Sequence, residues 1–545
     1  MHGLQALLAL ALLLALSLAL PRPVNGATML VQTLPGGLSH IMAVLAIARS
    51  LHARGHSIHA LMADYDLLAL RERGLLDDFV QPIAFKTPPG SVQRFEALVA
   101  DYQAKPQDFI GVSIQHYEEV CRQVLRDSDA LAALRRLNAT LTLADITWAC
   151  SNPVAQVLGL PLVGVSPIEL PDPFWHPIHG FPYSPAAHPF ISSGMAPPLS
   201  FLDRIINTLV SKIIYAITVP VADASAHRLG REFSLPVMPT TKATHRGALL
   251  LLINTAWGLS TPRSLPPKLK MVGPLLVGKE PRPLPPALQH IIKQAGDGGI
   301  VVASFGSVFR PRSCDVARGL AAALAATNRT VVWAVNSTHF PATCPLASLG
   351  LPARVHTLAW TPQGDLLSQP GVRAFLTHAG QNSVSEAGWH GVPMVCLPQS
   401  ADQLDSCAKA VKAGWALEFK SAELAPDTAH SLAATIERVS SNAAFAQKAA
   451  SVRAMLRAHP QLPVEQAADW VEYALALPPG ADLEDPAAAL PWWRWHCLDV
   501  WAAVAAALLA CLAVLALALR AAWRLARRTF PAKAAALTVD GKKES

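Results

Sequence analysis

The clearest structural signal in the chain is the segment Trp360–Gln403, which reads WTPQGDLLSQPGVRAFLTHAGQNSVSEAGWHGVPMVCLPQSADQ. Within it, Phe375–Thr377 is predicted to be a buried strand and Asn382–His390 a helix, and a turn of small residues joins the two. This is the pattern of a parallel α/β unit in which a helix begins directly after a strand. Backbone N–H groups and the helix dipole at such a helix start favour a bound phosphate.

The polar side chains of this segment are suited to a nucleoside diphosphate. Glu386 can accept two hydroxyl donors from a ribose, and Trp360 with Gln363 offers a stacking plane and a planar amide for a flat base. Taken singly, each has an ordinary structural interpretation, such as core packing for Trp360 or a solvated helix face for Glu386. The joint pattern favours a nucleotide-binding site, called the donor site below. It is made of Trp360, Gln363, His378, Gly380, Asn382, Ser383, Glu386, Asp402 and Gln403.

The rest of the body shows two successive α/β halves. Residues 27–33 predict a strand, and a Gly-rich turn leads into a helix with Ile41, Val44, Leu45, Ala48 and Leu51 at helical spacing. Strand and helix signals alternate to about residue 255, and residues 260–286 are crowded with proline, which predicts an ordered linker. The alternation then restarts at Ile300–Ser304. We therefore expect two doubly wound domains, 27–259 and 287–490, facing each other across a cleft.

The amino end has the composition of a signal peptide. Leu4 to Leu20 is almost all Leu and Ala, and small residues at Val24 and Gly26 suit cleavage after residue 26. Because this region lacks Lys and Arg before the apolar run, an uncleaved anchor is the alternative.

The carboxyl end has the composition of a membrane anchor. Val500–Leu519 is uncharged and long enough to cross a bilayer, with tryptophans at both ends. Arginines from Arg520 onward place the tail, 520–545, in the cytosol, and a buried core helix would explain neither flank. Lys542 and Lys543 match a dilysine retrieval signal, so we expect a single-pass type I protein of the endoplasmic reticulum with a lumenal body.

Composition excludes several other classes of protein. Of 545 residues, 52% are apolar and only 15% are charged. The net charge is +7, and part of this excess positive charge lies in the tail after the apolar segment Val500–Leu519. We therefore expect no nucleic-acid partner. Eight cysteines without a C-x-x-C pair argue against a zinc ribbon. Sequons at Asn138, Asn328 and Asn336 agree with a lumenal body. Six cysteines in that body permit disulfides, but the sequence alone does not reveal how they pair.

The Trp360–Gln403 segment resembles the signature of the UDP-glycosyltransferase family, of the membrane-bound glucuronosyltransferase and glucosyltransferase type. Signal peptide, lumenal body, anchor and dilysine tail follow the plan of its animal members. The resemblance implies two facing Rossmann-like domains of the GT-B type plus a transmembrane helix. Two residues depart from the signature, since Gln369 replaces a usual His and Ala379 a usual Gly. Phe305-Gly306-Ser307 resembles the family loop at the diphosphate, so Ser307 joins the donor site.

The resemblance also assigns catalytic residues in the first half. His40 matches the family's catalytic histidine and Asp145 the aspartate that supports it. Independently of the resemblance, an imidazole can take a proton from an acceptor hydroxyl, and a carboxylate on its other nitrogen stabilises the imidazolium. The resemblance implies a single displacement with inversion at the sugar C1, with a UDP-sugar as donor and no metal or other cofactor.

Two features bear on the substrates. Relatives that use glucuronate tend to carry Arg after Leu-Ile shortly before the Pro-rich linker, whereas Leu252-Ile253 is followed here by Asn254. We therefore expect a neutral hexose, because no guanidinium pairs with a sugar carboxylate at that position. Aromatic residues at Phe174, Trp175, Phe181 and Phe190 suggest a small apolar acceptor, although core packing explains them equally well.

Two alternatives from other classes remain at this stage. A non-catalytic lumenal relative that holds a nucleotide or lipid would not need His40 and Asp145. A Rossmann oxidoreductase would need a G-x-G-x-x-G turn, which the sequence lacks. Both are less consistent with the sequence than a UDP-sugar hexosyltransferase.

Overall fold

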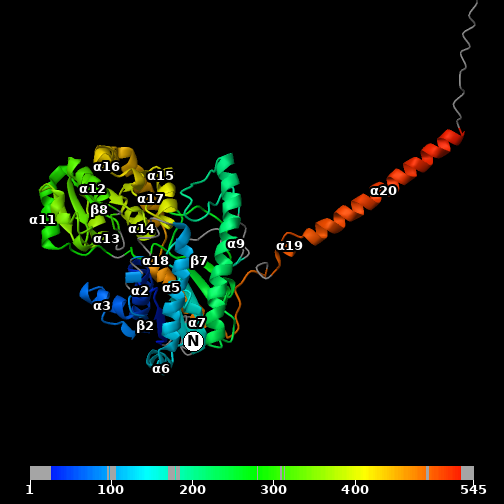
Figure 1. Ribbon diagram of the computed structural model, residues 1–545, viewed down its shortest axis with the longest axis horizontal. Helices are drawn as coiled ribbons and strands as arrows, with labels where there is room; N and C mark the ends of the chain where they lie inside the picture. Colours follow the sequence, from blue (N-terminus) through cyan, green and yellow to red (C-terminus); the bar gives the residue numbers. More distant parts are fainter. Residues whose placement is uncertain are drawn as a thin grey trace, which may run out of the picture. The chain divides into compact units, whose positions relative to one another are not determined.

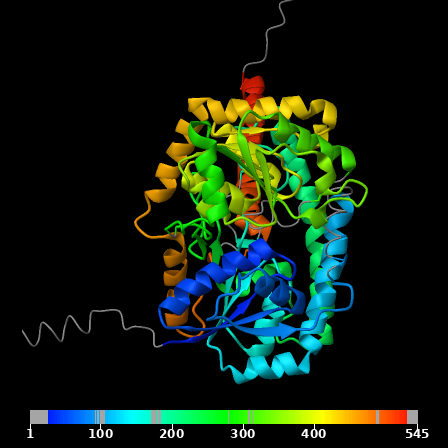
Figure 2. The same cartoon turned by 90° about the vertical axis from the view of Figure 1, so that its left-hand side faces the viewer.

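The computed structural model describes residues 26–91, 93–94, 97, 106–169, 178–179, 184–278, 280–306, 310–311, 313–486 and 490–529. A compact unit ends at Asp485, and a second unit begins at Pro486. Residues 1–25 of the expected signal peptide and the dilysine end lie outside the described residues. Figures 1 and 2 show that the compact unit contains two α/β halves, one with the amino-terminal strands and one with the later strands.

The first half is built on a seven-stranded sheet in the order β3-β2-β1-β4-β5-β6-β7, with every neighbouring pair parallel. Its strands are β1 (Thr28–Gln32), β2 (Ser57–Ala63), β3 (Gln81–Phe85), β4 (Leu141–Asp145), β5 (Leu162–Ser166), β6 (Ala248–Ile253) and β7 (Leu269–Met271). Its helices are α2 (Leu38–Ala53), α3 (Asp64–Glu72), α5 (Pro106–Arg126), α6 (Ser128–Arg136), α7 (Ser151–Leu158), α9 (Phe201–Glu232) and α10 (Thr241–Gly247).

The predicted opening of this half is confirmed. β1 and α2 cover the expected strand and helix, and Ile41, Val44, Leu45, Ala48 and Leu51 are all fully buried in one core. Removing one of the larger of these aliphatic side chains from water contributes about 1.5–3 kcal/mol to the stability of the fold. This burial fixes the helix that begins at Leu38 against the sheet.

The second half has a six-stranded parallel sheet in the order β10-β9-β8-β11-β12-β13. Its strands are β8 (Ile300–Ser304), β9 (Thr330–Ala334), β10 (Val355–Leu358), β11 (Val372–Thr377), β12 (Met394–Cys396) and β13 (Ala416–Glu418). Its helices are α11 (Pro286–Ala295), α12 (Cys314–Ala326), α13 (Gln363–Leu367), α14 (Gln381–His390), α15 (Asp402–Lys412), α16 (Ala429–Ser441) and α17 (Ala443–Arg457).

Both sheets reverse their strand order at one point. In the first sheet the reversal lies between β1 and β4, and in the second between β8 and β11. In doubly wound sheets, ligands bind beyond the carboxyl ends of the strands at this reversal. The expected fold class, two doubly wound Rossmann-like halves, is therefore confirmed, and its geometry directs attention to the residues that follow these four strands.

Two segments connect the halves. The proline-rich stretch 260–286 contains β7, which pairs with β6 and extends the first sheet. After α17, helix α18 (Pro463–Ala476) returns to the first half and buries Val464, Ala467, Ala468 and Val471 in the core that contains α2. Arg54 at the end of α2 bonds Glu465, Asp469 and Glu472 of α18. Figure 1 shows α18 beside α2.

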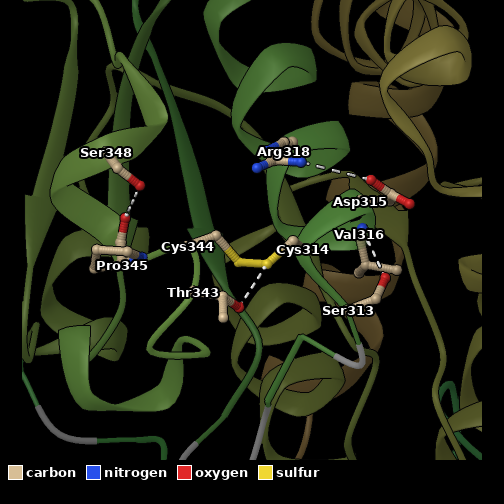
Figure 3. Close-up of a disulfide and its surroundings, with 9 residues drawn as sticks. All are labelled: Ser313, Cys314, Asp315, Val316, Arg318, Thr343, Cys344, Pro345 and Ser348. Carbon is tan, nitrogen blue, oxygen red and sulfur yellow. Dashed lines mark hydrogen bonds and ion pairs between the residues drawn. A yellow bond between two sulfur atoms is a disulfide. The ribbon is translucent and has the colours of Figure 1, made fainter.

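One disulfide closes a loop in each half. Cys121 pairs with Cys150 in the first half, and Cys314 pairs with Cys344 in the second (Figure 3). The second bridge ties the start of α12 to the loop after β9. Cys396 and Cys407 are buried as thiols. The structure thus gives the pairing that the sequence left open.

The second unit contains α19 (Trp492–Trp495) and α20 (Leu498–Thr529). The side chains of α20 are exposed, and its mean hydropathy over the best 18-residue window is 2.8. The helix includes the expected span Val500–Leu519 and continues through the arginines that follow it. It is long and apolar enough to cross a bilayer.

Candidate functional site

A histidine and an aspartate meet at the reversal of the first sheet. His40 lies in the first turn of α2, directly after β1, and Asp145 is the last residue of β4. His40 Nδ1 lies 2.8 Å from Asp145 Oδ2, and the Asp145 side chain is fully buried whereas that of His40 is 21% exposed. Since a carboxylate only accepts, Nδ1–H donates, and Nε2 is left to accept a proton.

The charge around His40 favours its protonated form. Burial lowers the pKa of His40, but the Asp145 carboxylate raises it through charge and hydrogen bonding. Asp402 of the second half raises it further, and the net pKa lies above the usual value for histidine. Groups from both halves therefore act on this imidazole.

Two further residues hold this pair in place. The Thr147 backbone N–H and hydroxyl both donate to Asp145 Oδ1, at 2.9 and 2.5 Å, so both carboxylate oxygens have partners. On the other side, Asp66 Oδ2 accepts from the Gly36 N–H at 3.0 Å and fixes the turn that begins α2. Burial raises the pKa of Asp66 to about 7. No pattern in the sequence marks Thr147 or Asp66 as a site residue.

At the reversal of the second sheet, the His378 ring lies between two glycines. A side chain at Gly380 would come within 2.6 Å of His378 Nε2, and one at Gly306 within 2.9 Å. Gly306 also has a φ of +76°. Both glycines are therefore needed to fit the ring. Burial lowers the pKa of His378 to about 4, so the imidazole is neutral near pH 7 and retains one N–H donor.

Two alanines in this half adopt backbone conformations typical of glycine. Ala379, where the family usually has glycine, has a φ of +63°. Ala401, directly before Asp402, has a φ of +54° and a ψ of −136°. L-residues adopt such conformations at a cost of about 1–3 kcal/mol, and the cost is concentrated at functional sites in many proteins. The strain lies beside candidate site residues in both cases.

The expected base and ribose residues form one cluster. The Gln363 amide donates to the Glu386 carboxylate and lies 3.4 Å from Ser383 Oγ. Glu386 is buried on α14, and burial raises its pKa to about 7. Trp360 is 51% exposed, with the Arg73 guanidinium of the first half 5.9 Å from its ring centroid. An exposed indole three residues before the amide that bonds a buried carboxylate can supply a stacking plane for a base, while the carboxylate can accept sugar hydroxyls.

The start of α14 connects the two halves. Asn382 Nδ2 donates to the Ser39 carbonyl at 3.3 Å, and Asn382 Oδ1 accepts from Asn254 Nδ2 at 2.9 Å. The side chain of Gln381 donates to the Asn254 carbonyl. Asn254 itself is fully buried, and its amide also donates to the Pro167 carbonyl and accepts from the Leu275 N–H. The helix expected to bind phosphate is thus hydrogen-bonded to the residue that precedes His40.

The remaining expected residues are placed as follows. Asp402 Oδ2 lies 3.3 Å from the Gln381 N–H at the start of α14, and burial raises the pKa of Asp402. Gln403 Oε1 accepts from the Gln399 N–H and braces the preceding turn. Ser307 lies outside the described residues, as do Phe174, Trp175 and Phe181. The structure therefore gathers His40, Asp145, Asn382 and Asp402 in one region, and Trp360, Gln363, Ser383 and Glu386 in another on the same half as His378.

The fold and these two groups of residues define a class of protein. The structure superimposes on a "Glycotransferase of kitacinnamycin" with a TM-score of 0.56 and 19% identity, over 83% of this chain and 100% of the other. It likewise superimposes on a "UDP-glucose: anthocyanidin 3-O-glucosyltransferase in complex with UDP" with a TM-score of 0.56 and 17% identity, over 83% and 99%. Two parallel doubly wound sheets of this kind are the GT-B glycosyltransferase fold.

The chain belongs to the family described as "UDP-glucoronosyl and UDP-glucosyl transferase", whose signature matches residues 28–534. It is 27% identical to "UDP-glucuronosyltransferase 2B17" of Rattus norvegicus, over 86% of this chain and 88% of that protein. It is 26% identical to "UDP-glucuronosyltransferase 3A2" of Mus musculus, over 85% and 87%. The protein is therefore a UDP-glycosyltransferase, an enzyme that transfers a sugar from a UDP-sugar donor to an acceptor.

Proposed function

We propose that the protein transfers a neutral hexose from UDP to a hydroxyl group of a small apolar acceptor, with inversion at the sugar C1. The observation that carries the catalytic part is the 2.8 Å contact between His40 Nδ1 and the buried Asp145 carboxylate. His40 Nε2 takes the proton of the acceptor hydroxyl while the oxygen attacks C1. The bond from C1 to the β-phosphate oxygen breaks, and UDP leaves with the electron pair. Asp145 stabilises the imidazolium that forms.

The second half is the proposed donor site. Trp360 stacks on the base, and Gln363 hydrogen-bonds its edge. The Glu386 carboxylate accepts from the ribose hydroxyls. His378, the α14 amino end and the Gly306–Ser307 loop receive the diphosphate, because N–H donors at a helix start stabilise the charge that develops on the leaving group. In this proposal Asp402 and Gln403 bind the hydroxyls of the sugar.

The choice of a neutral hexose rests on Asn254. This side chain is uncharged, so it offers no cation to a sugar carboxylate. Its amide group is hydrogen-bonded to Pro167, Asn382 and Leu275. The relatives named above are glucuronosyltransferases, so UDP-glucuronate is the donor against which the proposal of a neutral hexose is tested. The purified full chain is incubated with one phenol and each of UDP-glucose, UDP-galactose, UDP-N-acetylglucosamine and UDP-glucuronate. Faster turnover with UDP-glucuronate than with any UDP-hexose would overturn the proposal.

The proposed topology is type I in the endoplasmic reticulum membrane, with residues 27–259 and 287–490 as lumenal domains joined by 260–286. The two disulfides support an oxidising compartment. Asn138 and Asn328 are exposed, as glycan acceptors must be. Protease added to sealed microsomes should remove only residues of the tail after Arg520, and endoglycosidase should shift the mobility of the chain. Digestion of the body in sealed vesicles contradicts this orientation.

A non-catalytic relative was the alternative left open by the sequence, and membership of an enzyme family stands against it. It predicts UDP binding without transfer to any acceptor in the panel. The intact His40–Asp145 contact favours the enzyme, because a carrier has no need of a buried carboxylate on a histidine at the site of proton transfer.

A further inference from the structure

Helix α9 (Phe201–Glu232) runs along the outside of the compact unit (Figure 1). The polarity of its faces is reversed relative to that of a helix on a water-soluble body. Such a helix normally buries its apolar side chains and exposes its polar ones. In α9 the residues buried against the body include Asn207, Ser211 and Ser225. The exposed apolar residues are Phe201, Leu202, Ile205, Ile206, Leu209, Ile213, Ile217 and Val221, and the best 18-residue window has a mean hydropathy of 1.7.

The polar side of α9 is hydrogen-bonded to the body along its length. Asn207 accepts from the Phe190 N–H at 2.7 Å and donates to the carbonyls of Pro185 and His188. Further along, Ser225 donates to Glu118 of α5 at 2.8 Å. These bonds keep α9 on the body. By length and composition α9 could cross a bilayer, but crossing would break these hydrogen bonds. The apolar face of α9 must therefore be covered in another way.

The point at which the chain leaves the compact unit is linked through α10 to the carboxyl-terminal part of α9. Glu484, next to the last residue of that unit, accepts from Lys268 Nζ at 3.0 Å and lies 3.9 Å from Arg246 Nε of α10. The first amide of α10, at Thr241, donates to Asp223 of α9 at 2.6 Å. Helix α10 therefore connects the exit point to α9. From Asp485 to Leu498 the chain has about 13 residues, which span at most about 45 Å.

We propose that the exposed face of α9 lies in the interfacial layer of the membrane that α20 crosses, as a second attachment of the lumenal body. The proposal rests on the topology proposed above. The connection limits only the distance between the exit point and the start of α20. Phe201 to Val221 forms an apolar stripe about 30 Å long at 1.5 Å per residue. Within the stripe, the Asp203 carboxylate accepts from the N–H of Ser200, the residue that caps the helix start, while the cations Arg204 and Lys212 are exposed. Exposed cations beside an apolar face can reach the phosphate groups of lipid headgroups in the interfacial layer.

The test places a fluorescent label at single positions of the full chain. Cys497 and Cys511, the exposed thiols among the described residues, are first replaced by serine. In this background, Ile213→Cys puts a label on the apolar face of α9. Gln447→Cys puts the matched control label on the exposed surface of α17. Retaining Cys511 alone puts a label on α20 as the positive control. Each protein is reconstituted into phosphatidylcholine–phosphatidylserine vesicles with and without nitroxide-labelled lipid.

The nitroxide lipid should quench the label at 213 at least about twofold more than the label at 447, and should quench the label at 511 strongly. Leu209→Cys and Ile217→Cys on the same face should behave like Ile213→Cys, which protects the result against one misfolded variant. Quenching at 511 without quenching on α9 overturns the inference and leaves the anchor intact. A blue-shifted but unquenched label at 213 shows a protein cover, either another segment of the chain or a second copy, and also overturns it. An unquenched label at 511 refutes the anchor itself.

Discussion

The side-chain amide of Asn382 donates to the backbone carbonyl of Ser39, 3.3 Å away, and so joins the start of α14 to the start of α2. The two residues lie on helices of different halves, and each lies one or two residues from a proposed reacting or phosphate-binding group. Asn254, which bonds Asn382 from the end of β6, makes this connection continuous with the core of the first half. The proposed base and the proposed leaving-group site are therefore held by one hydrogen-bonded chain.

His40→Ala should lower turnover by roughly 10²–10⁴-fold, the usual contribution of a positioned proton acceptor. The affinity for UDP should barely change, because the proposed nucleotide contacts all lie in the second half. Steady-state rates with one UDP-hexose and calorimetry with UDP measure the two quantities separately.

The acidity of the acceptor provides an internal control for this variant. An acidic phenol is already partly ionised and should lose less rate than an aliphatic alcohol when the base is removed. Near-normal turnover of His40→Ala on an aliphatic alcohol would show that His40 is not the base.

Asp145→Asn should lower turnover and also move its dependence on pH. A base must be neutral, so activity rises with pH as the His40 imidazolium loses its proton. Asp145 raises the pKa of His40, and an amide cannot do so to the same extent, so the acidic limb of the kcat/KM profile should move to lower pH. Rates measured between pH 5 and pH 9 give this limb.

The double variant His40→Ala/Asp145→Asn should turn over at about the same rate as the slower of the two single variants, because the two residues act as one unit. Multiplicative losses, or an acidic limb that stays in place in Asp145→Asn, would contradict a direct role of the carboxylate on His40.

The sequence predicted local structure and the ends of strands well. Apolar spacing in residues 27–51 was enough for β1 and α2, since that pattern reports burial on one face. The resemblance named His40 and Asp145, and the reversal between β1 and β4 explains physically why residues 105 positions apart meet.

Contacts between distant segments could not be predicted in this way. Helix α18 buries its apolar face on α2, but the same face would have fitted the second half equally well by pattern alone. The pairing of Cys121 with Cys150 depends on the packing of α5 beside α7, which no spacing rule gives. The partners of Asn254 were also hidden, because a single polar residue at the end of a strand does not reveal which groups it satisfies.

Ala401→Gly should raise the stability of the protein. The φ of +54° with ψ of −136° is strained for alanine and not for glycine, at a cost of about 1–3 kcal/mol. Glycine gives back about 0.4–1 kcal/mol through the greater freedom of the unfolded chain. We expect a net gain of about 1 kcal/mol, seen as a higher midpoint of thermal unfolding in detergent.

The matched control for this variant is Ala379→Gly. Its φ of +63° lies in the left-handed region, which costs alanine about 1–2 kcal/mol, so after the loss of about 0.4–1 kcal/mol through the unfolded chain its gain should be smaller than that of Ala401→Gly. No rise in Ala401→Gly would show that the backbone at Ala401 is relaxed, and an equal rise in both variants would show that it is no more strained than the backbone at Ala379.

Glu386→Gln should remove a pH dependence from UDP binding. Burial raises the pKa of the Glu386 carboxyl group to about 7. The folded protein therefore binds the proton of this group more tightly than the unfolded chain does. As a result, the protein loses stability as the pH rises from the ordinary glutamate range to about 7. Only the carboxylate accepts two ribose hydroxyls, so UDP affinity should increase by about tenfold from pH 6 to pH 8 in the unmodified protein. Titrations with UDP at both pH values measure this for both proteins. Ionisation of the diphosphate is common to the two, so their difference isolates Glu386, and equal pH dependence in both would exclude it from the ribose site.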